Sequence, residues 1–292
     1  MPVNSSAVGA RFGERTVEVT PRMILAYAAA IGDTAAGTFD DADSAGFMAP
    51  PPFCVSLEWS TVSDSGIYKL LGTSAQENRQ TLHLGQDSYF HQPVVSGQRL
   101  KIFGTLTSVR TSRSGAITIS KLETINERSG EPVVTSWTTA LMRGVAVCGE
   151  DNSVEDAPAD SRESAGETQT IEIPIAREMP HVYSECSGIW NPIHTERRVA
   201  LAAGLPDIIL HGTASWALAG REITRIYANS DGRRLCRLAG RFAATIIPGT
   251  TVMLEHSRSA QNTNTINFKI RNSEGEAAID GGIAELTEID DP

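Results

Sequence analysis

The chain has 292 residues, of which 40% are hydrophobic and 21% charged, a composition typical of a folded protein with room for two domains. Its formal net charge of -10 argues against a general nucleic-acid binder, because phosphate contacts need a positive surface. No apolar run reaches membrane-spanning length, and the first 19 residues lack the apolar core of a signal peptide. We therefore expect a cytoplasmic protein that binds neither nucleic acid nor membrane.

The four cysteines do not form a recognisable pattern. Cys54, Cys148, Cys186 and Cys236 lack CxxC spacing, so we expect neither a metal site nor a disulfide framework. We interpret them as free thiols in a reducing compartment. Cys186 is interpreted as a small residue packed on a helix rather than as a nucleophile.

The first half opens with a helix signal. Thr20 and Pro21 supply a capping hydroxyl and a proline at the first helical position, and Gly32 marks the end. An apolar-rich segment over 54–71 has helical length. Three segments rich in β-branched residues then predict strands. They span 99–109, 116–125 and 133–141.

Residues 148–170 differ from everything around them. The segment contains seven acidic residues, one arginine and almost no large apolar side chain. Such a segment cannot bury itself, so we interpret it as a solvated linker that divides the chain nearly in half.

The second half repeats the plan of the first. A helix is predicted over 213–228, followed by strands over 251–257, 265–271 and 277–286. Turn-forming residues at 126–130 and 272–275 predict one hairpin in each half. Helices followed by a run of antiparallel strands are typical of an α+β fold.

Four sequence features recur in the same order in the two halves. Tyr27 precedes Gly32 by five residues, as Tyr183 precedes Gly188. The other matches are Gly46 with Gly204, Phe90 and Gly97 with Phe242 and Gly249, and Asn126 and Gly130 with Asn272 and Gly275. The offset drifts from 156 to 145, which small loop insertions explain, so the halves are interpreted as diverged repeats.

The segment from Tyr183 to Thr213 places two histidines in settings that chemistry can use. His194 follows Asn191, Pro192 and Ile193, which form a tight non-helical bend, and His211 precedes Gly212 at the start of the predicted helix. This segment resembles the signature of MaoC-like (R)-specific enoyl-CoA hydratases, whose pattern is a tyrosine, then Ser-Gly-Asp-x-Asn-Pro-Ile-His, then His-Gly.

The resemblance covers nearly the whole chain and implies a fold. It implies an α+β double hot dog, in which each half is a long helix wrapped by an antiparallel sheet. The first half is similar to the N-terminal dehydratase-like domain of this group and the second half to its hydratase domain. The implied divisions are 1–147 and 171–292, joined by the acidic linker 148–170.

The resemblance also implies a site at His194, Asn191 and Gly212. Hydration of an enoyl thioester needs a base, an acid and donors that hold the thioester oxyanion. His194 matches the catalytic histidine and Asn191 the asparagine. Gly212 matches the glycine whose N–H faces the thioester oxygen, a role that suits a helix N-terminus. His211 is interpreted as a residue that orders the loop.

Position 189 departs from the family pattern, because Ile189 stands where the catalytic aspartate belongs. Isoleucine neither accepts a proton nor orients water. Glu185 and Glu196 are the nearest carboxylates in sequence, and either is an alternative. The first half retains Asp33 after Gly32 but has Thr38 at the histidine position, so we interpret Asp33 as a remnant or a helix-ending cap.

Three functions are consistent with these residues. The first is an acyl-CoA hydratase or dehydratase acting on an enoyl- or 3-hydroxyacyl-CoA thioester. The second is a specialised hot-dog lyase, isomerase or cyclase that uses one histidine base. The third is a non-catalytic thioester-binding protein. We expect no cofactor beyond the CoA thioester as substrate, no metal, and a homodimer.

Overall fold

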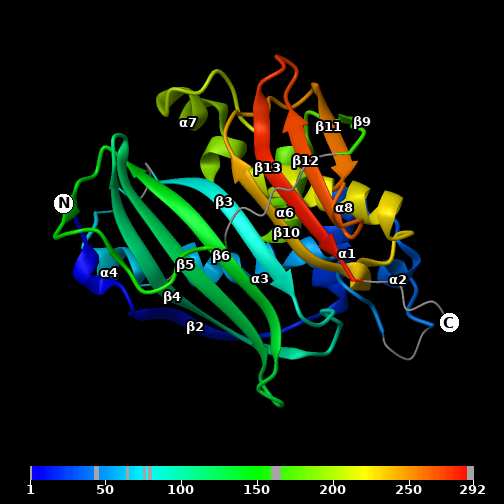
Figure 1. Ribbon diagram of the computed structural model, residues 1–292, viewed down its shortest axis with the longest axis horizontal. Coiled ribbons are helices and arrows are strands. Elements are labelled where there is room, and N and C mark those ends of the chain that lie inside the picture. The colour runs from blue at the N-terminus through cyan, green and yellow to red at the C-terminus, as the bar shows by residue number, and fades with distance from the viewer. Residues whose placement is uncertain are drawn as a thin grey trace. The chain divides into compact units, whose positions relative to one another are not determined.

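The computed structural model describes residues 2–42, 46–63, 66–74, 77, 81–158 and 166–287 (Figure 1). They form two compact units, and each is described by itself. The first unit comprises 1–18, 57–91 and 99–159. The second unit comprises 19–56, 92–98 and 160–292.

The first unit is built on a five-stranded antiparallel sheet in the order β2-β4-β5-β6-β3. Its strands are β2 (Arg11–Glu18), β3 (Thr81–Phe90), β4 (Arg99–Ser112), β5 (Gly115–Asn126) and β6 (Pro132–Arg143). The sheet is strongly curved, as β4, β5 and β6 show in Figure 1. A short parallel pair adds β1 (Val3–Asn4) and β7 (Val147–Cys148), and a 3-10 turn spans Ser5–Ala7.

Two helices of the first unit bury apolar and polar side chains against this sheet. They are α3 (Cys54–Ser63), which enters the unit at Leu57, and α4 (Ile67–Leu71). Apolar residues of α4 pack into a core with Leu106, Leu122 and Met142. Glu58 of α3 instead bonds to Ser136 of β6 and Gln86 of β3, so a carboxyl group lies in the interior of this unit.

The first part of the predicted linker is anchored to the first unit. Strand β8 (Asn152–Ser153) pairs with β4, and the amide of Val154 bonds to the carbonyl of Thr107. Glu155 and Asp156 form ion pairs with Lys121 and Arg110. Most of 148–156 is exposed, as expected of a solvated segment, but Glu155 and Asp156 also pair with basic partners on β5 and β4. Residues 159–165 lie outside the described residues.

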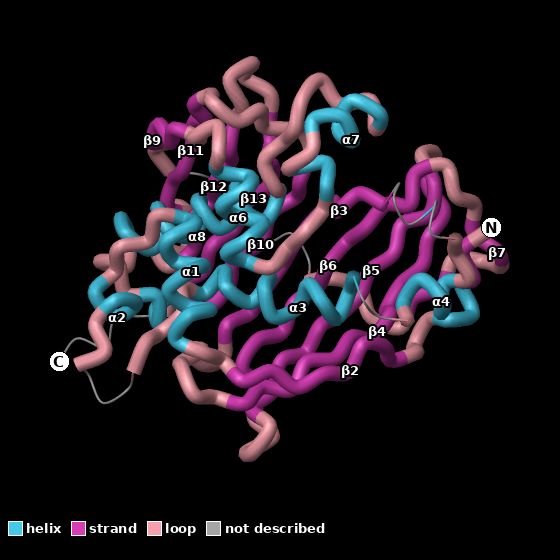
Figure 2. Tube along the Cα trace, turned by 180° about the vertical axis from the view of Figure 1, so that it is seen from behind, coloured by secondary structure: helices cyan, strands magenta, loops and turns pink. Residues whose placement is uncertain are grey.

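The second unit has a sheet in the order β10-β13-β12-β11-β9. Its strands are β9 (Gln169–Pro174), β10 (Leu235–Phe242), β11 (Thr251–Arg258), β12 (Thr265–Arg271) and β13 (Ala277–Leu286). The long helix α8 (Gly212–Tyr227) packs on β10, β12 and β13, and Figure 2 shows it on one face of these strands. Most of α8 is buried, including Trp216 at its centre.

The remaining helices of the second unit lie around α8. Helices α1 (Pro21–Ile31) and α6 (Met179–Ser187) pack against each other, and α1 also contacts α8. The shorter elements are α2 (Ala36–Phe39), α7 (Arg197–Ala202), and the 3-10 turns η2 (Pro51–Phe53), η3 (Pro192–His194) and η4 (Gly232–Arg234). No helix in the described part of the chain combines the length and hydropathy that crossing a bilayer requires.

The repeat predicted from the sequence is visible in the topology. Numbered within its own half, each sheet runs in the order 1-3-4-5-2. Each half places one helix after its first strand, and each of these helices ends at a left-handed glycine, Gly32 (φ 63°) or Gly188 (φ 71°). Both units therefore have the α+β architecture of a hot dog. The divisions 1–147, 148–170 and 171–292 stay a prediction, and the compact units divide the chain differently.

Most predicted elements are confirmed. Helix α1 starts after the Thr20 cap and stops at Gly32, and α8 lies within one residue of its predicted range. The six predicted strands match β4, β5, β6, β11, β12 and β13, and the turns at 126–130 and 272–275 close by backbone hydrogen bonds. The single helix predicted over 54–71 is wrong, because α3 ends at Ser63 and α4 begins at Ile67.

Candidate functional site

His194 ends the turn η3, and its ring is held by one main-chain contact. The side-chain oxygen of Asn191 caps this turn by accepting from the amide of Ile193 at 3.3 Å. The Nδ1 atom of His194 lies 2.8 Å from the carbonyl oxygen of Ile209. Because a carbonyl only accepts, Nδ1 donates, and Nε2 carries the lone pair of the neutral ring. His194 thus presents a base at Nε2, with a tautomer fixed by Ile209.

His211 lies directly against His194. The two imidazole rings stack with centroids 3.6 Å apart and planes inclined by 22°. His211 is 2% exposed, and its Nε2 atom lies 3.2 Å from the carbonyl of Ile189 and 3.1 Å from the hydroxyl of Ser184. Its Nδ1 atom is buried and has no hydrogen-bond partner among the described residues. The structure therefore brings both motif histidines into one pair.

The environment keeps both rings neutral near pH 7. Burial lowers the pKa of His194 to about 4, although the hydrogen bond to Ile209 opposes this shift. Burial also lowers the pKa of His211 well below its usual value, and the neighbouring His194 lowers it further. Two stacked rings cannot both carry a charge at low cost, so the pair accepts one proton at most.

Two tyrosines at equivalent positions of the repeat lie behind the histidine pair. The ring of Tyr183 lies 5.0 Å from that of His211, and its hydroxyl is 3.5 Å from the hydroxyl of Tyr27. Tyr27 in turn donates to the carbonyl of Pro52 at 2.8 Å. Burial raises the pKa of Tyr183 to about 12, so its hydroxyl stays protonated and forms hydrogen bonds as a neutral group.

Gly212 is the first residue of α8, immediately after the cap His211. A Cβ atom at this position would approach the ring of Phe242 to 3.1 Å, so the packing favours glycine. The amides of the first helical turn have no acceptor inside the helix and carry positive potential. The start of α8 can therefore donate to an oxygen that develops negative charge.

Among the described residues, no carboxylate contacts His194 or His211 in place of the missing aspartate. Ile189 is 4% exposed, and its main-chain carbonyl, rather than its side chain, contacts His211. Glu185 and Glu196 are both exposed, the first on α6 and the second at the start of α7. The alternative that either carboxylate serves His194 finds no support in these positions.

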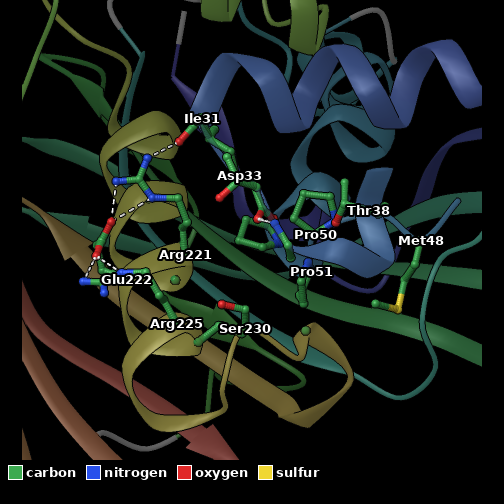
Figure 3. A pocket seen from close by; sticks show the side chains of 18 residues that line it. Ile31, Asp33, Thr38, Met48, Pro50, Pro51, Arg221, Glu222, Arg225 and Ser230 are labelled. Carbon is green, nitrogen blue, oxygen red and sulfur yellow. Dashed lines mark hydrogen bonds and ion pairs between the residues drawn. The ribbon is translucent and has the colours of Figure 1, made fainter. Parts of the chain in front are cut away.

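Asp33 lies at a different place, in a cavity formed around the first-half copy of the motif (Figure 3). The cavity measures about 240 Å³, and its lining includes Asp33 and Thr38 but not His194, Asn191 or Gly212. Asp33 accepts from the amide of Ala35 at 2.9 Å in the turn after α1, whereas the residue that caps the end of α1 is Gly32, so the interpretation of Asp33 as a helix-ending cap is wrong. Across the cavity, Arg221 and Arg225 of α8 both pair with Glu222.

Several other residues of the second half and of the first sheet make structural contacts. Arg110, Arg237 and Arg241 form ion pairs with carboxylates. Trp216 is fully buried, whereas Trp190 beside the site is 49% exposed. Burial, together with Glu185, raises the pKa of the Cys186 thiol, which disfavours a nucleophilic thiolate. Among the described residues, His, Cys, Asp and Glu do not gather in threes that suit a metal ion.

Ser184 and the paired tyrosines were not assigned a role in the sequence analysis. Ser184 contacts His211 from the middle of α6, and the sequence signal for it is only its place beside Tyr183. Tyr27 and Tyr183 had a clearer signal, since both hold the same position in the repeat.

Two curved antiparallel sheets, each with a helix packed against it, define this chain as an α+β protein of the hot-dog class. Its residues 6–136 match the model of the FAS1-like dehydratase domain region, and residues 161–278 match the MaoC like domain. The chain thus combines a FAS1-like dehydratase region with a MaoC like domain, and relatives named below are hydratases and dehydratases.

Curated relatives carry related names. The peroxisomal hydratase-dehydrogenase-epimerase of Neurospora crassa is 29% identical over 66% of this chain and 21% of its own length. The probable enoyl-CoA hydratase 2 of Dictyostelium discoideum is 23% identical over 63% and 62%. The 3-hydroxyacyl-thioester dehydratase Y of Mycobacterium tuberculosis is 24% identical over 70% and 72%. The chain thus spans less than two thirds of the first two relatives.

Solved structures share the fold. A MaoC-like dehydratase from Phytophthora capsici superposes with a TM-score of 0.81 at 21% identity, over 98% of this chain and 99% of that one. A Mycobacterium tuberculosis protein described as a double hotdog gives 0.63 at 13% identity, over 96% of each chain. These likenesses confirm the predicted double hot-dog fold.

Proposed function

We propose that this protein adds water to, or removes it from, an enoyl- or 3-hydroxyacyl-CoA thioester, with His194 as the acid and base. The observation that carries the proposal is the fixed tautomer of His194. Its Nδ1 proton is committed to Ile209, so Nε2 is a free base that lies at the start of α8. Relatives named as enoyl-CoA hydratases and hydroxyacyl-thioester dehydratases support the substrate class.

One histidine is chemically sufficient for the dehydration direction. Nε2 removes the proton on the α-carbon, and the electron pair forms the double bond as the bond from the β-carbon to oxygen breaks. The same imidazolium then returns the proton to the departing hydroxyl, which leaves as water. The amide of Gly212 at the first turn of α8 stabilises the negative charge on the thioester oxygen, and Asn191 supports the turn that carries His194.

The absence of a carboxylate at position 189 favours a second candidate. The buried Ile189 cannot hold a nucleophilic water, and a dry pocket suits transfer of an α-proton without water. A lyase or isomerase that uses His194 as its one base would fit the same contacts. A non-catalytic thioester-binding protein is a third outcome, and it would not require the free Nε2.

The decisive experiment supplies crotonyl-CoA and (R)-3-hydroxybutyryl-CoA to the purified protein. Interconversion of the two supports the hydratase, whereas shift of the double bond without water uptake supports the isomerase. If neither occurs, a rise in melting temperature with a panel of acyl-CoA thioesters supports binding alone, by mass action on the folded state. No reaction and no thermal shift with any thioester would refute the proposal.

Two further proposals concern the oligomeric state and the cellular location of the protein. Hot-dog dehydratases are generally dimeric, and we propose a homodimer, which sedimentation equilibrium would test. We also propose a cytoplasmic location, although one of the relatives named above is peroxisomal.

A further inference from the structure

His211 makes more contacts than the ordering of a loop requires. Its Nε2 contacts with Ile189 and Ser184 are enough to fix the segment before α8. They do not account for the second feature, a face-to-face stack on His194 at 3.6 Å. They also leave Nδ1 buried without a partner, an arrangement that costs stability and calls for an explanation.

The stack has an electrostatic consequence when His194 takes a proton. The new positive charge lies over the π face of a neutral imidazole, in a place where little water is present to solvate it. A cation over an aromatic face is attracted by the electrons of the ring, and the attraction grows when both partners are desolvated. Because the pair holds one proton at most, His211 remains the neutral member.

The neighbours of the pair supply no competing charge. Within the described residues, His194 contacts Ile209 and His211, and His211 contacts Ser184, Ile189 and Tyr183. Of these neighbours only Tyr183 titrates, and it stays protonated because burial raises its pKa to about 12. Two titratable side chains lie nearby without contacting either ring: His181 bonds to the carbonyl of Thr195, and Glu185 is exposed.

We propose that His211 is a positioning residue that holds the His194 ring by stacking and stabilises the imidazolium formed during proton transfer. His211 would thereby stabilise the positive charge on His194, as a carboxylate at position 189 would and Ile189 cannot. The contact from His211 to residue 189 goes through the main chain, so it is available whatever side chain stands there. This inference rests on the proposed function of His194, and the tests below separate the two.

Two substitutions test separately the stacking of the His211 ring and its hydrogen bond through Nε2. His211→Gln places an amide nitrogen near the position of Nε2 but removes the ring. His211→Phe keeps a flat π face but loses the donor. We expect the glutamine variant to lose roughly 10-fold in kcat with little change in KM. We expect the phenylalanine variant to stay within about 3-fold of the unsubstituted protein. The reverse order, or equal losses in two folded variants, would overturn the inference.

A measurement without substrate keeps the inference testable if activity is absent or a variant fails to fold. In the unsubstituted protein, NMR signals of the His211 ring should shift with the same midpoint as those of His194. In the glutamine variant the pKa of His194 should fall, and in the phenylalanine variant it should stay. A His211 ring that does not respond when His194 titrates would refute the stack. An active His194→Ala variant would instead refute the proposed function.

Discussion

The two copies of the motif share a left-handed glycine at the end of a helix but differ in the chemical groups that follow it. After α1, the left-handed Gly32 leads to Asp33 and Thr38; after α6, the left-handed Gly188 leads to Ile189 and His194. The first copy has the acid without the imidazole, and the second has the imidazole without the acid. The shared features are the ones that shape the chain, which indicates that folding constrains both copies and proton transfer only one.

The spaces next to the two loops differ accordingly. Beside Asp33 and Thr38 there is a cavity of about 240 Å³. Beside Ile189 two imidazole rings stack on each other, one from the loop and one from the start of α8. The cavity beside the first loop does not include His194 in its lining.

The largest expected effect comes from removing the base in one copy only. His194→Ala should lower the rate of crotonyl-CoA hydration, or of the native reaction, by about 10²–10⁴-fold, because it removes the proposed acid and base of the reaction. Thr38→Ala, the matched change in the first copy, should leave the rate unchanged. Initial rates for both variants, with melting curves as a control on folding, test the contrast. Full activity in a folded His194→Ala protein would end the assignment of the site.

Exchanging the acid positions probes the same contrast through stability. Ile189→Asp buries a carboxyl among apolar groups and should destabilise the fold by roughly 3 kcal/mol. Asp33→Ile loses the hydrogen bond to the amide of Ala35 at a half-exposed site and should cost about 1 kcal/mol. Urea unfolding measures both differences.

Ile189→Asp also separates the two candidate reactions. We expect it to impair the native reaction, since a drier pocket suits a single neutral histidine. A rise in crotonyl-CoA hydration in the folded variant would show instead that the protein is an ordinary hydratase with one group missing.

Two buried groups, Glu58 and His194, should contribute to stability with opposite dependence on pH. Burial raises the pKa of Glu58 in the first unit to about 8, so its protonated form stabilises the fold most below about pH 4.5 and this contribution is lost as pH rises through 8. For His194 in the second unit the pKa is lowered to about 4, so its contribution is present above about pH 6.5 and is lost as pH falls through 4.

Glu58→Gln tests whether Glu58 causes the loss of stability as pH rises. The variant should remove most of the decline in stability between pH 6 and 8, which amounts to at most about 1.4 kcal/mol per pH unit. Denaturant unfolding at several pH values measures it. A decline as steep in Glu58→Gln as in the unsubstituted protein would show that Glu58 is not the group responsible.

The smallest expected effect distinguishes the two parts of the acidic segment. Because 147–148 pairs with β1, and 152–156 contacts β4 and β5, limited proteolysis should spare these residues and cut between 157 and 168. Mass spectrometry of the first fragments locates the cut. Early cleavage inside 149–154 would show that the β8 pairing is weak in solution, and early cleavage inside α8 would contradict its burial.

Sequence patterns predicted the elements whose residues have strong local preferences. Helix α1 has a capping threonine, a proline and a closing glycine, and β5 is rich in isoleucine and threonine. Two of the strands that were not predicted, β3 and β10, have a different composition. β3 contains a histidine, a glycine and an aspartate, and β10 carries two arginines and a glycine, so neither shows the alternation of a half-buried strand.

The break between α3 and α4 includes Gly66, which directly precedes α4 and is a weak helix former. At the site, the motif located His194, Asn191 and Gly212 but not the relation among them. The stack joins residues 17 positions apart, and the tautomer depends on a carbonyl 15 positions away, at Ile209. Contacts of that kind are set by tertiary packing, which a local pattern does not encode.

The hydroxyl contact between Tyr27 and Tyr183 has a meaning for the history of the chain. A residue that touches its own counterpart lies near the axis that relates the two copies, as in a symmetric dimer. In a dimer of identical subunits one mutation changes both sides of such a contact. Here the two tyrosines have separate codons, and their partners already differ: Tyr27 bonds to Pro52, and Tyr183 interacts with Thr213. Because both tyrosines lie in one chain, a mutation can change one side of this contact without changing the other.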